Sequence, residues 1–211
     1  MSRPILWTST RSSGTAAHLA LAASGLDAEV RFISLRDGEH RRPDYLAINP
    51  KGEVPALQLA GGATITEIPA IMAWLAEAAP EAGLLPAGQP ERAHALEWLA
   101  WCHFHMANPL WVAFQAGHTW ALEEAAAQRL REMALERWRA DLDHAERALA
   151  GRDTLLGTGW PTAPDLFLFT LLRLSAFLGV DTGGWPNLER LSRTVAGYPP
   201  AAAALAREGE A

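Results

Sequence analysis

The sequence has 211 residues, of which 49% are hydrophobic and 20% charged, so it has the composition of an ordinary globular protein with a sizeable core. Its formal net charge is -6, and its 18 lysine and arginine residues form no basic block, which excludes a surface built for nucleic acid or an anionic membrane. Small molecules or other proteins are therefore the expected partners.

The N-terminal segment MSRPILWTST lacks the apolar core of a signal peptide, and no apolar run is long enough to span a membrane. The sequence therefore predicts a cytoplasmic protein. Cys102 is the only cysteine, which excludes an internal disulfide, a cysteine-rich zinc site and a Cys-x-x-Cys redox pair. Its tryptophan and leucine neighbours indicate that Cys102 is a buried apolar residue.

The first third of the chain has a β-α-β pattern followed by a hairpin and a helix. The predicted elements are a strand at 4–8, a helix at 14–25, a strand at 28–35, strands at 56–59 and 63–66, and a helix at 69–80. Gly25 ends the first helix, Gly61 and Gly62 have the spacing of a tight hairpin, and Pro69 lies in a first helical turn. Residues 36–43 are predicted to be a charged loop.

A segment rich in proline and glycine follows, and everything after it has helical periodicity. The sequence predicts a first domain at 1–80, a linker at 81–89 and an all-helical domain at 90–211. One face of a long helix carries apolar residues at three- and four-residue steps: Leu135, Trp138, Leu142, Ala145 and Leu149. Residues 162–178 are so apolar that they predict a buried helix, and shorter helices are expected at 187–196 and 200–207.

A proline at the mouth of the predicted strand 56–59 is unusual, because proline donates no ladder hydrogen bond. We expect the Val54–Pro55 bond to be cis. This geometry would turn the N–H and C=O of Val54 outward, where an extended peptide could pair with them as an added strand.

Glu67 stands directly before the predicted helix 69–80, whose first amide groups attract anions. A ligand with an ammonium beside a carboxylate fits this place, because Glu67 would meet the ammonium and the helix amides the carboxylate. One short peptide could therefore contact both Val54 and Glu67. The plainer interpretations are an edge proline and a helix-start carboxylate.

Five segments together resemble the glutathione transferases, specifically their bacterial beta-like group, over essentially the whole chain. They are AINPKGEVPAL, TITEIPAIMAWLAE, LEWLAW, PTAPDLFLFTLLR and AGYPPAAAALAREG. In the fourth, Thr162 is the expected N-cap and Asp165 the N3 residue of a capping box. The resemblance implies a thioredoxin-like α/β N-terminal domain that binds glutathione, and an all-α C-terminal domain that forms the electrophile site. It also implies a homodimer and no metal.

The implied activity is conjugation of the glutathione thiol to small hydrophobic electrophiles, with glutathione as co-substrate. A free thiol with a pKa of about 8.5 is mostly protonated at neutral pH, so the protein must stabilise the thiolate. Beta-like members carry a cysteine before the first helix, and aligning that helix puts Ser13 at its position. We expect a serine hydroxyl to act here, with Ser13 preferred over Ser12 and then Ser9, although serine is also a common helix cap.

The chain departs from the family pattern at two places. The residue after the motif glutamate is usually serine, threonine or glycine, but here it is Ile68, and the following Pro69 has no N–H, so the γ-glutamyl pocket has fewer donors. The helical-domain histidine of beta-like enzymes falls on Ala107. The predicted glutathione contacts are nevertheless the motif residues and two basic residues: Val54, Pro55, Glu67, Ile68, Arg36 and Lys51.

Several aromatic residues are candidates for the electrophile pocket. The predicted set is His105, Trp111 and Trp7, with Trp101 and Trp120 as further candidates, and core packing is the alternative for the tryptophans. His103 and His105 suggest a metal pair, but side chains two residues apart on a helix diverge, so a structural or pocket role is favoured.

Two other functions remain open. The first is a non-catalytic ligand-binding protein on the same scaffold, which would explain Ile68, Pro69 and the absent cysteine and histidine. The second is a glutathione-dependent reductase or dehalogenase, which is less favoured because the loop has no thiol to hold a mixed disulfide.

Overall fold

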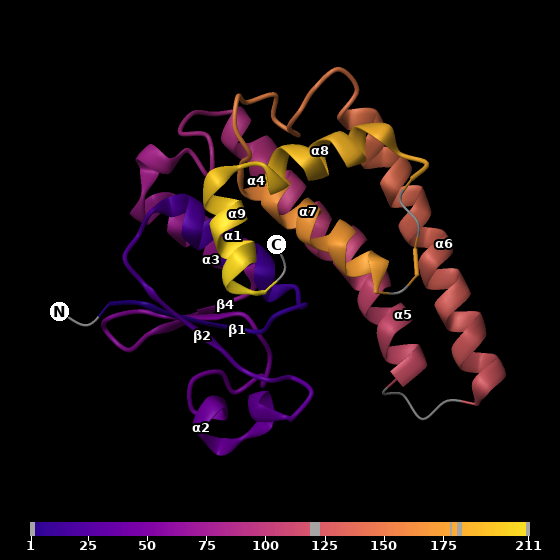
Figure 1. Cartoon of the computed structure of the whole chain (residues 1–211), viewed down its shortest axis with the longest axis horizontal. Helices are drawn as coiled ribbons and strands as arrows, with labels where there is room; N and C mark the ends of the chain where they lie inside the picture. Colours follow the sequence, from indigo (N-terminus) through magenta and orange to yellow (C-terminus); the bar gives the residue numbers. More distant parts are fainter. Residues whose placement is uncertain (1–2, 119–122, 178, 181–182, 210–211) are drawn as a thin grey trace. The chain divides into compact units, whose positions relative to one another are not determined.

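The computed structural model describes residues 3–118, 123–177, 179–180 and 183–209 (Figure 1). The chain divides into two compact units, one of residues 1–92 with 196–211 and one of residues 93–195. The predicted domains, 1–80 and 90–211, stay a prediction. They differ from the two compact units, because residues 196–211 belong to the first unit. In the described part of the chain, no helix combines the length and the apolar character needed to cross a bilayer.

The first unit contains a four-stranded mixed sheet in the order β2-β1-β3-β4. The strands are β1 (Ile5–Thr8), β2 (Glu29–Phe32), β3 (Ala56–Gln58) and β4 (Thr64–Thr66). β1 pairs parallel with β2 and antiparallel with β3, which pairs antiparallel with β4. The predicted strands and hairpin are confirmed, and Gly62 in the turn has a φ of 89°, which glycine adopts without strain.

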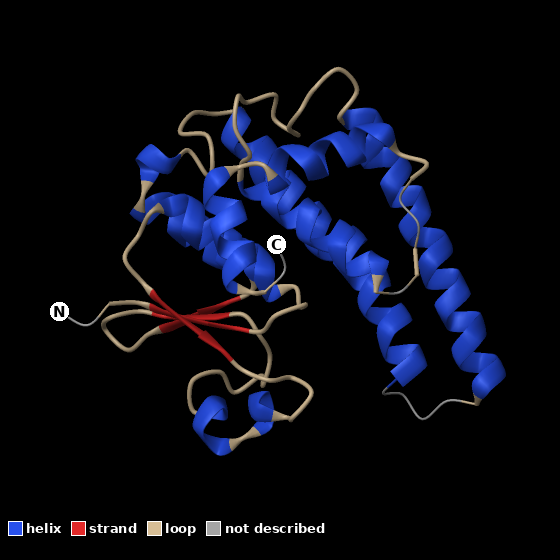
Figure 2. Cartoon of the chain, in the orientation of Figure 1, coloured by secondary structure: helices blue, strands red, loops and turns tan. Residues whose placement is uncertain are grey.

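Helices cover both faces of this sheet (Figure 2). α1 (Gly14–Ser24), α3 (Ile68–Ala78) and α9 (Pro199–Arg207) lie on one face, and the short α2 (Pro43–Leu46) lies on the other. α1 is buried along most of its length because it packs between the sheet, α3 and α9. The predicted loop 36–43 is more regular than expected, since it contains the 3-10 helix η1 (Glu39–Arg41) and the first residue of α2. A further 3-10 turn, η2 (Pro80–Ala82), follows α3.

The second unit is helical in its described residues. Its elements are α4 (Glu91–Trp101, which begins in the first unit), the π-helix η3 (Cys102–Ala107), α5 (Asn108–His118), α6 (Glu124–Ala148), α7 (Ala163–Ala176) and α8 (Pro186–Ala196). α7 is buried continuously from Ala163 to Leu172, as its apolar sequence predicts. On α6, the predicted apolar face is confirmed for Trp138 and Leu142, whereas Leu135 is half-buried. The sequence did not indicate the π-helix.

The predicted capping box starts α7. The Asp165 carboxylate accepts hydrogen bonds from the Thr162 N–H at 2.7 Å, the Thr162 hydroxyl at 2.6 Å and the Leu155 N–H at 2.7 Å. Burial raises the pKa of Asp165 and outweighs these hydrogen bonds, which lower it. Cys102 is fully buried as expected, and burial raises the pKa of its thiol, so it is a packing residue.

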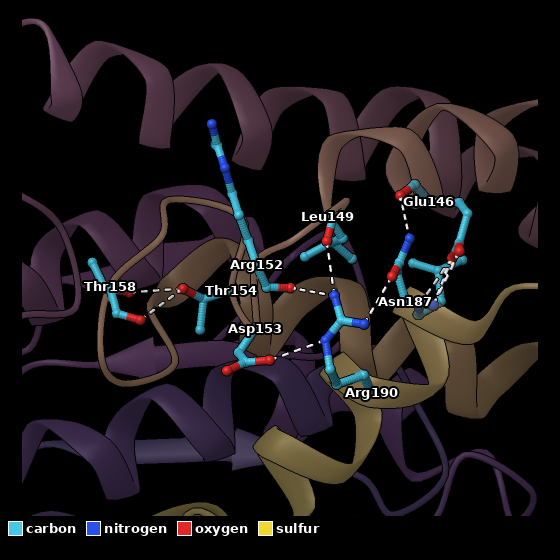
Figure 3. A network of polar contacts seen from close by, with 9 residues as sticks. Glu146, Leu149, Arg152, Asp153, Thr154, Thr158, Asn187 and Arg190 are labelled. Atoms are coloured by element: carbon cyan, nitrogen blue, oxygen red, sulfur yellow. Dashed lines mark hydrogen bonds and ion pairs between the residues drawn. The ribbon is translucent and has the colours of Figure 1, made fainter.

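A polar network joins α6 to α8 in the second unit (Figure 3). The Glu146 carboxylate accepts the N–H of Asn187 at 3.0 Å, which satisfies an otherwise unpaired amide at the start of α8. Arg190 donates to the carbonyls of Leu149 at 2.9 Å and Arg152 at 2.6 Å. This arginine therefore fixes the chain that leaves α6.

Candidate functional site

The register of the first unit brings three segments to one end of its sheet. Trp7 pairs with Ala56, and Ala56 pairs with Thr66. In antiparallel pairs, residues beyond the last partners stay close, so the loop after β1, the start of β3 and the residue after β4 meet. The candidate serines, the Val54–Pro55 bond and Glu67 belong to these three segments.

The Val54–Pro55 peptide bond is cis, as the sequence predicts. Pro55 is buried and Val54 half-buried. Among the described residues, no main-chain partner is found for the N–H or C=O of Val54. These groups are thus available to an extended ligand.

The carbonyl just before Val54 is held by two side chains that the sequence reasoning missed. The Tyr45 hydroxyl donates to Glu53 O at 2.6 Å, and Asn49 Nδ2 donates to the same oxygen at 2.7 Å. Burial raises the pKa of Tyr45 to about 12, so its hydroxyl remains a donor at neutral pH. Asn49 before a proline and a glycine is a recognisable turn signal, but nothing local marks Tyr45.

Glu67 is the N-cap residue of α3, as predicted, and has an unusual backbone. Its φ of 68° and ψ of 123° lie in a region that L residues rarely adopt, and such strain concentrates at ligand sites. Its side chain contacts Lys51 Nζ, which also lies 2.9 Å from Thr66 Oγ1. The structure therefore brings together two predicted ligand contacts, Lys51 and Glu67, as a partly exposed ion pair.

The first amides of α3 form an open helix start. Ile71 N–H bonds to Glu67 O at 2.9 Å, and among the described residues the N–H groups of Ile68 and Ala70 have no main-chain acceptor. Ile68 is buried and Pro69 has no N–H. The first turn of α3 therefore offers fewer amide donors than a helix that begins without proline, as expected. The remaining amides and the helix dipole still favour a bound carboxylate.

The three candidate serines differ in what their hydroxyls do. Ser12 Oγ donates to Ser9 O at 2.7 Å and accepts the Gly14 N–H at 3.1 Å, so it closes the loop. Ser9 makes one long contact, 3.5 Å to Thr10 O. Ser13 is the half-buried N-cap of α1, and its hydroxyl makes no capping bond and has no hydrogen-bond partner among the described residues. Ser13 thus offers a hydroxyl at a helix N-terminus.

Gly14 explains why the chain can turn so tightly behind Ser13. A Cβ at this position would lie 2.3 Å from the buried Thr8 Oγ1 and 3.0 Å from Ser12 Oγ. Only glycine fits here without displacing the loop. The site therefore combines a hydroxyl, exposed main-chain groups and an anion-binding helix start, which together suit a peptide with a thiol and a free carboxylate.

Comparisons with known proteins agree with this geometry. A family model described as the N-terminal domain of glutathione S-transferase matches residues 14–78. A maleylacetoacetate isomerase of Pseudomonas aeruginosa is 33% identical over 208 residues, which cover 92% of this chain and 92% of the relative. Glutathione S-transferase GST-4.5 of Xanthomonas campestris pv. campestris is 30% identical over 205 residues, which cover 97% and 98%. The chain belongs to the glutathione S-transferase family.

Solved structures support the same family and class. A sphingomonad glutathione S-transferase complexed with glutathione is 32% identical with a TM-score of 0.84, covering 98% of this chain and 100% of that chain. A bacterial beta-class transferase of Sphingomonas chungbukensis is 28% identical, also with a TM-score of 0.84, covering 98% of this chain and 100% of that chain. The resemblance to bacterial beta-class glutathione transferases is therefore confirmed, as is the thioredoxin-like fold with a helical second part.

Two further predicted site residues of this transferase, Arg36 and Trp7, belong to the first unit. Arg36 is exposed in the turn after β2. Trp7 packs edge-on against Tyr45 at 5.9 Å between ring centroids, with the Arg31 guanidinium 4.9 Å from its ring centroid. Both stay predicted ligand contacts.

In the second unit, His105 stacks on Trp101 with ring centroids 6.1 Å apart, and Arg137 Nη2 lies 2.9 Å from its Nδ1. Trp111 on α5 is 51% exposed. Both remain candidates for the electrophile pocket, and Trp120 lies outside the described residues. The described chain contains no group of three or more histidine, cysteine or acidic residues that could hold a metal ion.

Proposed function

We propose that this chain conjugates the thiol of glutathione to small hydrophobic electrophiles, with the thiolate stabilised by the Ser13 hydroxyl. The observation that carries the proposal is the Ser13 hydroxyl at the N-terminus of α1, without an internal partner in the described chain. A hydroxyl donor together with the helix dipole lowers the pKa of a neighbouring thiol. The bound thiolate forms a C–S bond with the electrophile. In a substitution the leaving group departs with its electron pair, and in an addition the carbanion that forms takes up a proton.

The rest of the first-unit site fits the other parts of glutathione. The main chain of Val54 would pair with the central cysteine residue of the tripeptide. Glu67 would accept its ammonium, and the amides of Ile68 and Ala70 would receive its γ-glutamyl carboxylate. The Lys51 ammonium, which pairs with Glu67 in the structure, would then also contact the ligand. The homodimer and the roles of Arg36, His105, Trp111 and Trp7 are further parts of this proposal.

A second candidate is isomerisation of a maleyl-type acid, favoured by the relative named maleylacetoacetate isomerase. The same thiolate would add to the cis double bond, the new single bond would rotate, and elimination of the thiolate would form the trans double bond. Glutathione is recovered in this reaction but consumed in conjugation. Both functions need the same stabilised thiolate.

The test compares both reactions in the purified full-length protein. We expect an aryl halide to consume glutathione and form a thioether at a rate above the uncatalysed reaction. Conversion of maleylacetoacetate to its trans isomer without loss of thiol would instead support the second candidate. If neither product forms at millimolar glutathione and calorimetry detects no binding of glutathione, the proposal is rejected in favour of a non-catalytic ligand-binding protein.

Replacing Tyr45 by phenylalanine is expected to weaken glutathione binding about two- to tenfold, because the Glu53 carbonyl loses one of its two donors and Val54 is held less firmly. The rate constant kcat should change little, since Tyr45 does not touch the thiol. Calorimetry and steady-state kinetics measure both effects. Tyr198→Phe is the matched control, and equal affinities for the two variants would contradict the prediction.

A further inference from the structure

A buried polar cluster joins the end of the chain to the start of α1. Glu208, the residue after α9, accepts a hydrogen bond from Thr15 Oγ1 at 2.9 Å, and its other carboxylate oxygen lies 2.7 Å from His18 Nδ1. Thr15 and His18 are 2% and 1% exposed, and the Glu208 side chain is fully buried. The three residues lie within the first unit.

Such a carboxylate is expensive to bury unless its oxygens are paired. Thr15 and His18 are three residues apart, so they share one face of α1, and one carboxylate holds both. Glu208 is itself fixed, because its N–H bonds to Ala204 O at 3.2 Å and Leu205 O at 3.0 Å. Figure 1 shows α9 beside α1, so the cluster fastens two packed helices.

The fastened turn is the one that carries Ser13. The Ser13 carbonyl accepts the Ala16 N–H at 3.1 Å, and the Thr15 N–H bonds to Ser12 O at 3.2 Å. The serine loop therefore moves with the first turn of α1. A displacement of Thr15 is transmitted to Ser12 and Ser13 through these short main-chain bonds.

We propose that Glu208 is a positioning residue that holds the Ser13 hydroxyl in place for thiolate stabilisation. This inference rests on the proposed function, since Glu208 acts on the transfer only through Ser13. Glu208 touches neither the thiol nor the electrophile; it fixes the helix turn that presents the hydroxyl. Small displacements of a catalytic group cost large factors in rate, so a distant carboxylate can control kcat in this way.

The experiment replaces Glu208 by glutamine, which keeps the shape and removes the second acceptor oxygen. We expect kcat for conjugation to fall about tenfold. The KM for glutathione should change little, because Val54 and Glu67 are untouched. The thiol of bound glutathione, titrated by the ultraviolet absorbance of its thiolate, should show a raised pKa. Hydrogen exchange at the amides of residues 14–18 should become faster.

A double variant tests the route through Ser13. If Glu208 acts on that hydroxyl, Glu208→Gln should cost nothing more in a protein that already carries Ser13→Ala. Thr15→Val removes the hydroxyl that Glu208 accepts and should lower kcat as Glu208→Gln does. Thr15→Ser keeps the hydroxyl and should retain most of the activity. These two variants test the proposal even if Glu208→Gln does not fold. Losses in kcat that multiply in the double variant would overturn the proposal.

Arg190→Met is the stability control, because it removes two carbonyl contacts within the second unit. It should lower the thermal midpoint and leave the thiol pKa unchanged. If Glu208→Gln behaves like this control and loses stability while kcat and the thiol pKa stay normal, the positioning role is overturned. A wild-type protein without any transfer would instead reject the proposed function, so the two failures are distinguishable.

Discussion

Replacing Ser13 by alanine is expected to lower kcat/KM for glutathione conjugation about 100- to 1000-fold, the usual cost of removing one donor from a developing or bound anion. The Ser13 hydroxyl has no hydrogen-bond partner in the described chain, so its donor is available to the thiolate. Without it, the pKa of the bound glutathione thiol should rise toward its free value of about 8.5, because only the dipole of α1 still favours the thiolate. Glutathione affinity should change little, because Val54 and Glu67 remain. Stopped-flow kinetics and thiolate absorbance against pH measure these effects.

The other two serines are controls within the same loop. Ser9→Ala removes only a 3.5 Å contact and should leave the rate almost unchanged. Ser12→Ala removes two loop hydrogen bonds and should lower stability, with a smaller loss of rate. A normal thiolate titration in Ser13→Ala, combined with a lost one in Ser12→Ala, would transfer the role to Ser12.

Replacing Asp165 by alanine is expected to destabilise the protein by about 3–5 kcal/mol, the largest stability effect that we predict. Two buried main-chain N–H groups, those of Leu155 and Thr162, lose their acceptor together, and the first turn of α7 loses its cap. Since α7 is the buried helix of the second unit, its start has no access to water that could replace the carboxylate. Equilibrium denaturation with urea measures the free energy of unfolding.

Asp27→Ala is the matched control for this measurement. Asp27 forms an exposed ion pair with Arg3 at 3.4 Å, and such pairs contribute about 0–1 kcal/mol. The Asp165 variant should therefore unfold at a much lower urea concentration than the Asp27 variant. Equal midpoints would show that the start of α7 does not depend on its capping box.

The local features of this chain could be read from its sequence because they depend on neighbouring residues. Gly61 and Gly62 predict the hairpin, and Thr162 with Asp165 predicts the cap of α7. The apolar steps along α6 predict its buried face. The proline at the mouth of β3 likewise suggested the cis bond, and the chain order placed Glu67 directly before α3.

The tertiary structure decided which of these groups are available for chemistry. Ser9, Ser12 and Ser13 look alike in the sequence, and only the folded loop pairs the Ser12 hydroxyl and leaves that of Ser13 without a partner in the described chain. The contact of Lys51 with Glu67 likewise depends on the register of β3 and β4.

Contacts between residues far apart in the sequence could not be predicted, because they too depend on the tertiary structure. Glu208 meets His18 across 190 positions, a distance that no periodicity or motif spans. Helix packing and strand register bring such residues together, because burial of apolar surface by whole elements determines where each side chain ends up. The sequence by itself thus determined most of the strands and helices, the cap of α7 and the family, whereas the pairing of polar groups around Ser13 was decided by the fold.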